Sequence, residues 1–558
     1  MTITRKDLLK TAVDIFGWDT FRDGQLDAME AVVGGRDVLC VMPTGYGKSG
    51  IYQVPALTLP GVAVVVSPLI ALQRDQADAI NEAAGRVRAY VLNSTQAQGS
   101  IDEAWAAAEN PDETVRAKFL FLAPEQLARE EVADRLAALD VSLLVIDEAH
   151  CVSSWGHDFR PDYLQLGTLV QALGCPVLAL TATAAPPVRS EIIASLNLRE
   201  PLVLAHGFDR PNLHLAVQMH VSAEDKRRAV LETVPELPGP GLLYVATRRE
   251  TEDYAAGLEE RGMRAESYHS SRRAKDRKEV HRKFLDDEVD VVAATSAFGM
   301  GIDKPNVRFV VHSAIPDSID SYYQEIGRGG RDGEPAYAVL HYRPEDLGLR
   351  RFFASKTPDA DGLGQLLAVL RAHDGGATPA ELRTELGISS RKLGGLLNLL
   401  RESGAVTEDS GVYRAGTMSP EEAVEAAVAF AERRENIDQS RVDMARQYAE
   451  TTGCRREFLL GYFGEQLGGP CDNCDNCEKA AAQGDAPAGK PEPAQDPEAK
   501  PFPLQSPVAH SEWGPGMVMS YDDGTVTVLF ESEGYKTLSL DLVLEKDLLK
   551  PAGAVAED

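Results

Sequence analysis

The sequence predicts an α/β protein with two parallel-sheet lobes followed by smaller modules. From about residue 10 to residue 345, short apolar runs of strand length alternate with helical stretches. Near-continuous apolar strands separated by helices are typical of parallel sheets that are covered on both faces. The first series of strands comprises Val38–Val41, Ala63–Val66, Phe119–Leu122, Leu143–Ile146 and Val177–Leu180, and the second comprises Gly241–Val245, Val291–Ala294 and Phe309–His312.

Composition and charge limit the possible classes of protein. The chain has 558 residues, of which 44% are hydrophobic and 26% charged, and its formal net charge is −29. This composition excludes a wholly disordered, collagenous or small disulfide-stapled chain. The acidic total also argues against nucleic acid, because phosphate binders usually carry a basic surplus. However, residues 421–558 hold 12 basic and 27 acidic residues, about half of the excess, so a basic groove can still exist in the lobes.

The apolar runs and the N-terminus bear on location. No run approaches the roughly 18 apolar residues of a membrane span. Residues 1–18 predict an amphipathic helix and lack the features of a signal peptide. We therefore expect a cytoplasmic protein with no membrane contact, in which the seven cysteines are metal ligands or buried thiols rather than disulfides.

The last third of the chain has a different pattern of predicted elements. Three predicted helices and a hairpin suggest a winged helix, with Thr378 and Glu381 at capping-box spacing. A helical stretch with four cysteines, a Pro- and Ala-rich linker and alternating strands of a small β-barrel follow. The predicted domains are 1–200 (first lobe), 201–350 (second lobe, joined near Pro201–Pro211), 357–416 (winged-helix-like), 417–479 (helical metal-binding module), 480–505 (flexible linker) and 506–552 (barrel).

A phosphate-binding loop is predicted where the first strand meets a helix. Residues 42–49 match the P-loop pattern except at Met42, where the general pattern has glycine. In such loops backbone N–H groups cradle phosphate oxygens, the lysine reaches the β and γ phosphates, and the hydroxyl binds Mg²⁺. The residues concerned are Thr44, Gly45, Gly47, Lys48 and Ser49.

Two further motifs complete a nucleotide-hydrolysis site. Asp147 and Glu148 follow an apolar strand about 100 residues after the P-loop. In this position the first carboxylate can hold Mg²⁺, and the second can orient and deprotonate the attacking water. In the second lobe, Arg328 and Arg331 are three apart, which predicts that they share a helical face. Arginines supplied by another lobe make hydrolysis depend on lobe closure.

With these motifs the chain resembles a RecQ-family DNA helicase of superfamily 2, nearly continuously over residues 10–350. The resemblance implies two RecA-like lobes with ATP between them. Ser67–Gln76 and Thr181–Ala184 resemble the strand-contacting and coupling motifs of the family, and Ala297–Pro305 resembles its fifth motif. The resemblance assigns Trp18, Arg22 and Gln25 to the adenine and Asp303 to the ribose.

The segment after Asp147 and Glu148 is the most family-specific one. Its aromatic side chains suit the stacking of unpaired bases, and its arginine suits a phosphate. We expect a DNA sensor that gates ATP hydrolysis, formed by Trp155, His157, Phe159, Arg160 and Tyr163. A second candidate is a basic run, for which a solvated helix face and a surface that follows the phosphate backbone fit equally well. It comprises Arg272, Arg273, Lys275, Arg277, Lys278, Arg282 and Lys283.

Four cysteines predict a structural zinc site. Cys454, Cys471, Cys474 and Cys477 have a Cys-x16-Cys-x2-Cys-x2-Cys spacing, and four thiolates satisfy tetrahedral Zn²⁺. The zinc module of RecQ helicases has the same spacing. Cys40, Cys151 and Cys175 are expected to be buried thiols.

The chain departs from the family in two places. The winged-helix-like segment precedes the zinc cysteines, whereas RecQ proteins typically carry it afterwards. Arg391 and Lys392 in its third helix suit duplex DNA, although a protein-docking or spacer role fits nearly as well. The terminal barrel resembles the Tudor/SH3-like tail of UvrD-type helicases, which implies a protein partner such as RNA polymerase.

The expected activity is ATP- and Mg²⁺-dependent 3′ to 5′ DNA unwinding in repair or recombination, with the polarity implied by the resemblance. The substrates would be single-stranded DNA and tailed or forked duplexes. Two alternatives remain: an RNA helicase, and a partner-recruited remodelling or annealing ATPase with little unwinding.

Overall fold

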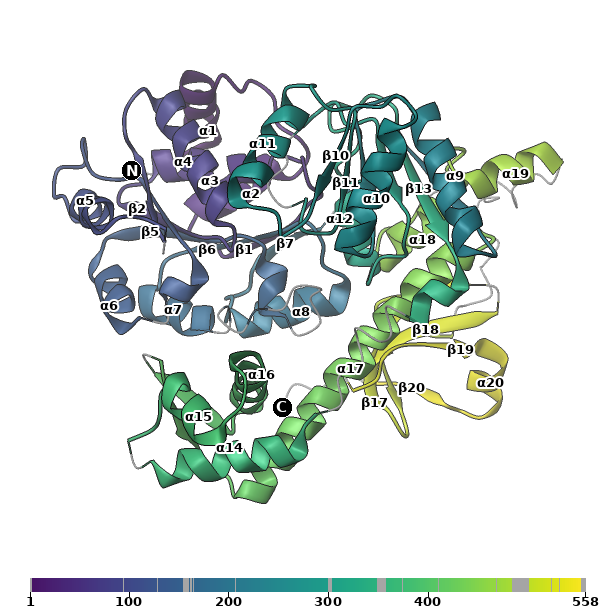
Figure 1. The fold of residues 1–558 in the computed structure, drawn as a ribbon. Helices are drawn as coiled ribbons and strands as arrows, with labels where there is room; N and C mark the ends of the chain where they lie inside the picture. Colours follow the sequence, from purple (N-terminus) through teal and green to yellow (C-terminus); the bar gives the residue numbers. More distant parts are fainter. Residues whose placement is uncertain are drawn as a thin grey trace.

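Figure 1 shows the computed structural model, which describes most of the chain and contains the two predicted parallel sheets. Among the described helices, none combines the length and the apolar character that a bilayer crossing requires. The described residues are 3–552 apart from 94, 128, 154–159, 161, 162, 164, 206, 300–303, 349–357, 374, 410, 468, 484–500, 523 and 531.

The first lobe is a seven-stranded parallel sheet in the order β3-β4-β2-β5-β6-β1-β7. In β1, Val38 pairs with Leu178 on one side and Leu202 on the other. The strands are β1 (Val38–Val41), β2 (Val62–Val66), β3 (Ala89–Leu92), β4 (Phe119–Leu122), β5 (Val141–Ile146), β6 (Val177–Thr181) and β7 (Leu202–Ala205). The α-helices are α1 (Arg5–Thr11), α2 (Gln25–Val33), α3 (Lys48–Thr58), α4 (Ile70–Ala84), α5 (Gln98–Ala108), α6 (Glu130–Ala138), α7 (Leu166–Leu173) and α8 (Pro186–Ser195).

The second lobe is a six-stranded parallel sheet in the order β10-β11-β9-β12-β13-β8. Its strands are β8 (Leu213–Met219), β9 (Gly241–Tyr244), β10 (Ala265–Tyr268), β11 (Val291–Ala294), β12 (Phe309–His312) and β13 (Ala336–Tyr342). Its α-helices are α9 (Ala223–Glu236), α10 (Arg248–Glu259), α11 (Ala274–Leu285) and α12 (Ile319–Ile326).

Five strands were not predicted, and four of them are sheet edges. β3 and β7 flank the first sheet, and β10 and β8 flank the second. Edge strands are less covered: all four residues of β7 are at least partly exposed, and burial alternates along most of β8. β8 and β10 accordingly lack the continuous apolar run of a central strand, whereas β3 and β7 are apolar throughout and were missed despite that pattern. The predicted joint at Pro201–Pro211 is therefore wrong in its first half, because β7 belongs to the first sheet.

The predicted winged-helix-like segment is a separate small core between the second lobe and the zinc cysteines. Thr378 and Glu381 form the expected capping box, with Thr378 N donating to Glu381 Oε2 at 2.8 Å. Ala423 and Ala427 of a following long helix complete this core. The segment comprises α14 (Ala360–Ala372), α15 (Pro379–Leu386), α16 (Ser390–Glu402), β14 (Val406–Asp409) and β15 (Val412–Ala415).

The long helix α17 (Pro420–Glu450) connects this segment to the second lobe, as Figure 1 shows. It leads into α18 (Arg455–Tyr462) and α19 (Asp475–Gln483). Cys454 directly precedes α18, Cys474 directly precedes α19, Cys477 lies in α19, and Cys471 lies in the stretch between the two helices. The predicted barrel is an antiparallel sheet in the order β19-β18-β17-β16-β20 in the described residues. We call residues 501–552 the C-terminal sheet; its elements are β16 (Pro507–His510), β17 (Gly514–Asp522), β18 (Thr525–Phe530), β19 (Gly534–Ser539), α20 (Leu540–Glu545) and β20 (Leu549–Pro551).

The C-terminal sheet packs against α17. Gln447 Nε2 donates to Thr537 Oγ1 at 3.1 Å. A Cβ atom at Gly534 would lie only 2.1 Å from Ser440 Oγ, so this contact requires glycine. The sheet is therefore seated on the helical module, although a flexible linker was predicted before it.

A buried histidine pair in the second lobe predicts acid sensitivity. His220 Nε2 lies 3.0 Å from His341 Nδ1, and burial lowers the pKa of His341 to about 3. Because the folded-state pKa lies below the unfolded value of about 6.5, the stability contributed by neutral His341 is lost as pH falls through 6.5 toward 3. For this group, the free energy of unfolding should drop by about 2 kcal/mol between pH 7 and pH 5.

Urea unfolding of the full chain at several pH values measures this loss. The variant His341→Gln should weaken the pH dependence. The control His373→Gln changes a histidine that pairs with Glu385 at 2.9 Å near the surface, and it should retain the pH dependence. Equal pH profiles for His341→Gln and the unmodified chain would contradict the assignment.

Candidate functional site

The P-loop lies between β1 and α3. Gly45 and Gly47 have φ values of 78° and 82°, which side-chain-bearing residues rarely adopt. Lys48 Nζ folds back onto its own loop and donates to Met42 O at 2.8 Å and to Pro43 O at 3.2 Å. Burial lowers the pKa of Lys48, opposed by the nearby carboxylates of Glu148 and Asp147.

The predicted carboxylates lie beside this loop, at the end of β5. Ser67 Oγ donates to Asp147 Oδ2 at 3.1 Å, and burial raises the pKa of Asp147 while Lys48 opposes the shift. Glu148 adopts φ +49°, and its Oε2 lies 3.4 Å from His150 Nδ1. His150 Nδ1 is also 2.9 Å from Thr181 Oγ1. A chain of contacts therefore runs from the carboxylates to the predicted coupling motif.

Ser49 has a partner that was not predicted among the site residues. Gln76 Nε2 of α4 donates to Ser49 Oγ at 3.1 Å, and the Gln76 side chain accepts a hydrogen bond from Tyr52. Gln76 thus fixes the hydroxyl that the P-loop pattern assigns to Mg²⁺. Its position at the end of the predicted strand-contacting motif was the available signal.

The predicted adenine-binding residues lie against the P-loop. Gln25 Oε1 accepts from Arg22 N at 2.8 Å, and Gln25 Nε2 donates to Tyr46 O at 2.9 Å. Arg22 donates to Gly45 O at 2.6 Å. Trp18 stacks on Phe16, with ring centroids 4.4 Å apart, and also packs over Gly50 of α3. The structure thus brings Trp18, Arg22 and Gln25 to the loop.

The two predicted arginines do not share a helical face, because α12 ends at Ile326 and both follow in turns. A Cβ atom at Gly45 would lie 3.1 Å from Arg331 Cδ, so Arg331 of the second lobe reaches the P-loop of the first. Arg328 instead donates to Gly299 O within its own lobe and is 5% exposed. The geometry places only Arg331 against the P-loop.

The segment predicted to contact DNA is partly outside the described residues, which exclude Trp155, His157 and Phe159. Arg160 is partly exposed, and its backbone N–H bonds Cys151 O at 2.9 Å. Tyr163 is fully buried and donates to Asp147 O at 3.0 Å. The prediction that Tyr163 stacks on DNA is therefore wrong, because its ring is core and its hydroxyl fixes the carboxylate turn. Asp303 also lies outside the described residues.

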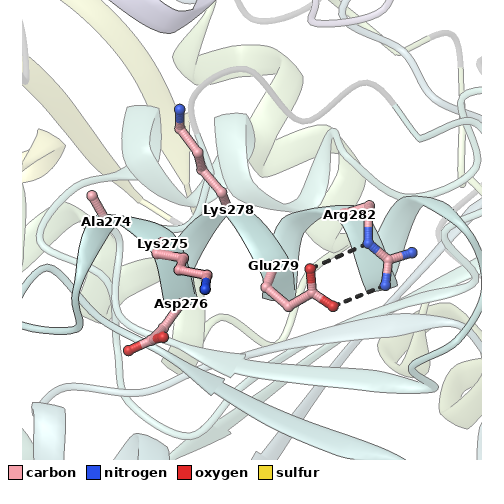
Figure 2. Close-up of a pocket in the computed structure, with 6 residues that line it drawn as sticks. All are labelled: Ala274, Lys275, Asp276, Lys278, Glu279 and Arg282. Carbon is pink, nitrogen blue, oxygen red and sulfur yellow. Dashed lines mark hydrogen bonds and ion pairs between the residues drawn. The ribbon is translucent and has the colours of Figure 1, made fainter.

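The predicted basic run spans the turn before α11 and that helix. The residues drawn in Figure 2 line a pocket of about 720 Å³ on this helix, and three of them belong to the run. Arg282 pairs with Glu279 at 2.9 Å and with Asp286 at 2.8 Å. Lys283 pairs with Glu266 at 2.8 Å. Lys275 and Lys278 are exposed. Part of the run is therefore a neutralised helix face, and the exposed side chains of Arg273, Lys275 and Lys278 can face a phosphate.

The four predicted zinc ligands converge. The Sγ atoms of Cys454, Cys471, Cys474 and Cys477 lie within 4.8 Å of one another. Cys471 and Cys477 are 3.9 Å apart, near the roughly 3.8 Å between thiolates on a tetrahedral Zn²⁺. The cluster can hold zinc without a position for a reactant. Cys40, Cys151 and Cys175 are buried thiols, as expected.

Three segments match known protein families. Residues 22–191 match the DEAD/DEAH box helicase family, residues 225–333 the helicase conserved C-terminal domain, and residues 418–478 the RecQ zinc-binding family. The chain is 38% identical over 366 residues to the probable ATP-dependent DNA helicase RecS of Bacillus subtilis, covering 65% of this chain and 72% of that protein. The chain belongs to the RecQ family.

Other relatives fit this membership. The RecQ protein of Pasteurella multocida is 35% identical over 476 residues, which is 84% of this chain but only 62% of that protein. The chain thus spans less than two thirds of that relative's length. The crystal structure of the helicase MrfA bound to DNA has a similar fold, with a TM-score of 0.51 and 16% identity, covering 75% of this chain and 63% of that one.

Two parts of this RecQ-family chain lie outside the three segments that match known families. The winged-helix-like segment falls between the second and third matches, and the C-terminal sheet follows the third. The long helix α17 joins these additions to the zinc module. Both additions therefore pack on a helix that lies within the RecQ zinc-binding match.

Proposed function

We propose that the chain is an ATP-dependent DNA helicase that moves 3′ to 5′ along one strand and unwinds duplexes in DNA repair or recombination. The observation that carries the proposal is Arg331 of the second lobe lying against Gly45 of the P-loop, because a hydrolysis site completed from both lobes couples ATP turnover to lobe movement. Relatives named ATP-dependent DNA helicase support DNA as the substrate.

The proposed roles follow the geometry. The backbone of Thr44, Gly45 and Gly47 and the charge of Lys48 hold phosphates, and Arg331 stabilises charge in the transition state. Glu148 orients the attacking water and accepts its proton. Mg²⁺, held by Ser49 and Asp147, would neutralise phosphate charge. Arg328 positions the second-lobe turn, Trp18, Arg22 and Gln25 bind adenine, and Asp303 approaches the ribose.

The proposed DNA signal reaches this site through His150. Trp155, His157, Phe159 and Arg160 contact the strand, and the connection from Glu148 through His150 to Thr181 supports their coupling to hydrolysis. Zn²⁺ on the four cysteines is structural. We propose the same division into domains as the sequence predicts, with one change: the first lobe extends through β7 to residue 205, and the second lobe follows it.

Location and partners are further proposals. We place the protein in the cytoplasm, because its relatives include bacterial DNA helicases. A protein partner, such as an RNA polymerase, would bind the C-terminal sheet on the side of α20, where Leu542 and Leu544 are 47% and 55% exposed.

ATP hydrolysis by the purified chain, measured with no nucleic acid, with single-stranded DNA and with RNA of the same sequence, tests the proposed substrate. The proposal predicts that DNA stimulates hydrolysis much more strongly than RNA. Equal or stronger stimulation by RNA would favour an RNA helicase and contradict the proposal.

A further inference from the structure

The turn that follows α18 in the zinc module packs on the joint between the two lobes. The ring of Phe463 stacks on that of Phe208, with centroids 4.7 Å apart and an angle of 2° between the planes. Both rings are essentially buried, at 0% and 1% exposure. Tyr323 of α12 packs beside them, and its hydroxyl donates to Phe208 O at 2.6 Å. The joint is therefore clamped by residues far from it in sequence.

Arg189 of α8 connects the first lobe to this clamp. Its Nε donates to Ala184 O at 2.9 Å, and its terminal nitrogen donates to Phe463 O at 2.6 Å. Ala184 is the last residue of the predicted coupling motif. The guanidinium also lies 6.0 Å from the centre of the Phe208 ring. One side chain thus joins the coupling motif, the joint and the zinc module.

The zinc module itself is fixed to the second lobe. Arg456 donates to Asp209 Oδ1 at 2.8 Å and to Leu213 O at 2.7 Å. Asp475 Oδ2 accepts from Val217 N at 3.2 Å. Because these contacts bind the module to β8 and the residues before it, the module must move with the second lobe. The contact from Arg189 to Phe463 O therefore spans two bodies that move relative to each other.

The joint also connects both halves of the proposed ATP site. A Cβ atom at Gly207 would lie 3.0 Å from the Tyr46 ring of the P-loop. Glu465 Oε1 accepts from Gly207 N at 2.7 Å. On the other side, Arg210 donates to Gly329 O at 2.8 Å and thereby holds the turn before Arg331. Fixing the joint therefore fixes the distance between the P-loop and that turn.

The C-terminal sheet supports the same turn of the zinc module. Gln505 Nε2 donates to Gly464 O at 3.2 Å. The ring of Tyr535 packs on that of Tyr462 at 5.6 Å between centroids, and Tyr462 donates to Asp320 of α12. The sheet thus stabilises the residues that contact the joint.

We propose that Arg189 is a positioning residue for ATP hydrolysis: its hydrogen bond to Phe463 O latches the zinc module to the first lobe and holds the lobes with Arg331 at the P-loop. This inference rests on the proposed function in one respect: the effect of Arg189 on catalysis is measured as the rate of ATP hydrolysis. Its two ends belong to the first lobe and to the module that the second lobe holds, so we expect movement of the lobes relative to each other to alter this bond. A residue with this role affects catalysis and lobe closure without touching the nucleotide.

The test is Arg189→Lys in the full-length, zinc-loaded chain, because lysine keeps the charge but cannot bridge two carbonyl groups as the guanidinium does. Arg199→Lys is the matched control: Arg199 also lies in the first lobe and bonds Asp37 and Cys175 O, away from the joint. Fluorescent labels on non-natural amino acids at the exposed positions Val115 and Val221, one in each lobe, report lobe distance without modifying cysteines.

Arg189→Lys should lower kcat of DNA-stimulated ATP hydrolysis about fivefold, the worth of one hydrogen bond, with little change in KM for ATP. It should also reduce the lobe closure that a non-hydrolysable ATP analogue induces. Arg199→Lys should change neither. The proposal is overturned if the two variants agree in both measurements, or if the analogue causes no closure in the unmodified chain.

Zinc content and the melting temperature show whether Arg189→Lys is folded. If it is not, Glu465→Ala, which removes the acceptor for Gly207 N, takes its place and must show the same two changes. Absence of ATP hydrolysis in the unmodified chain would refute the proposed function, whereas the distance measurement would still decide the latch.

Discussion

Replacing Arg331 by alanine is expected to lower kcat for ATP hydrolysis by about three orders of magnitude, the range measured for arginines that stabilise a transferring phosphoryl group. ATP binding should change little, because Lys48 and the backbone of the P-loop still hold the phosphates. The expectation rests on Arg331 being the second-lobe arginine that packs against Gly45. Stopped-flow or steady-state hydrolysis, combined with fluorescent-nucleotide binding, separates the two effects.

Two further variants sharpen this experiment. Arg331→Lys should recover only part of the rate, since an ammonium keeps the charge without the planar fork. Arg264→Ala removes an arginine of the same lobe that pairs with Asp290 at the surface, and it should behave like the unmodified chain. A normal hydrolysis rate for Arg331→Ala would remove the second lobe from the proposed catalytic site.

Replacing Lys48 by alanine should reduce ATP hydrolysis to below about 1% of the unmodified rate, because the charge that meets the β and γ phosphates is lost. In the structure Lys48 Nζ bonds two loop carbonyl groups and lies near Asp147 and Glu148. ATP must therefore draw the ammonium away from the loop carbonyls. Single-stranded DNA binding, measured by fluorescence anisotropy, should persist in the variant.

The control for this variant is Lys10→Ala, which removes an exposed lysine of α1 in the same lobe. It should leave hydrolysis unchanged. Turnover by Lys48→Ala comparable to that of the control would show that residues 42–49 do not form the working nucleotide site.

Much of the fold was predictable because its central strands are short, apolar and continuous. Val38–Val41, Phe119–Leu122 and Val291–Ala294 were predicted with the bounds that the structure has. Edge strands such as β8 and β10 were missed, because side chains at a sheet edge are only partly covered and need not be apolar. The capping box at Thr378 was predictable since it depends on residues three apart.

The site was predictable where its chemistry lies in contiguous motifs. The P-loop and the carboxylates of Asp147 and Glu148 meet as their spacing indicated. The different positions of Arg328 and Arg331 were not predictable, because they depend on where α12 ends. Local patterns also carried no signal for the contact between Arg189 and Phe463, whose residues are 274 positions apart. Such contacts depend on how complete domains pack.

The measurement that tests the central claim most directly is strand separation by the full-length chain on a 3′-tailed DNA duplex, with and without ATP. We predict unwinding that requires ATP, that is absent in Lys48→Ala, and that is weaker on a 5′-tailed duplex. If the chain hydrolyses ATP on single-stranded DNA yet separates no tailed, forked or four-way substrate, it is not a helicase, and a remodelling or annealing ATPase becomes the better account.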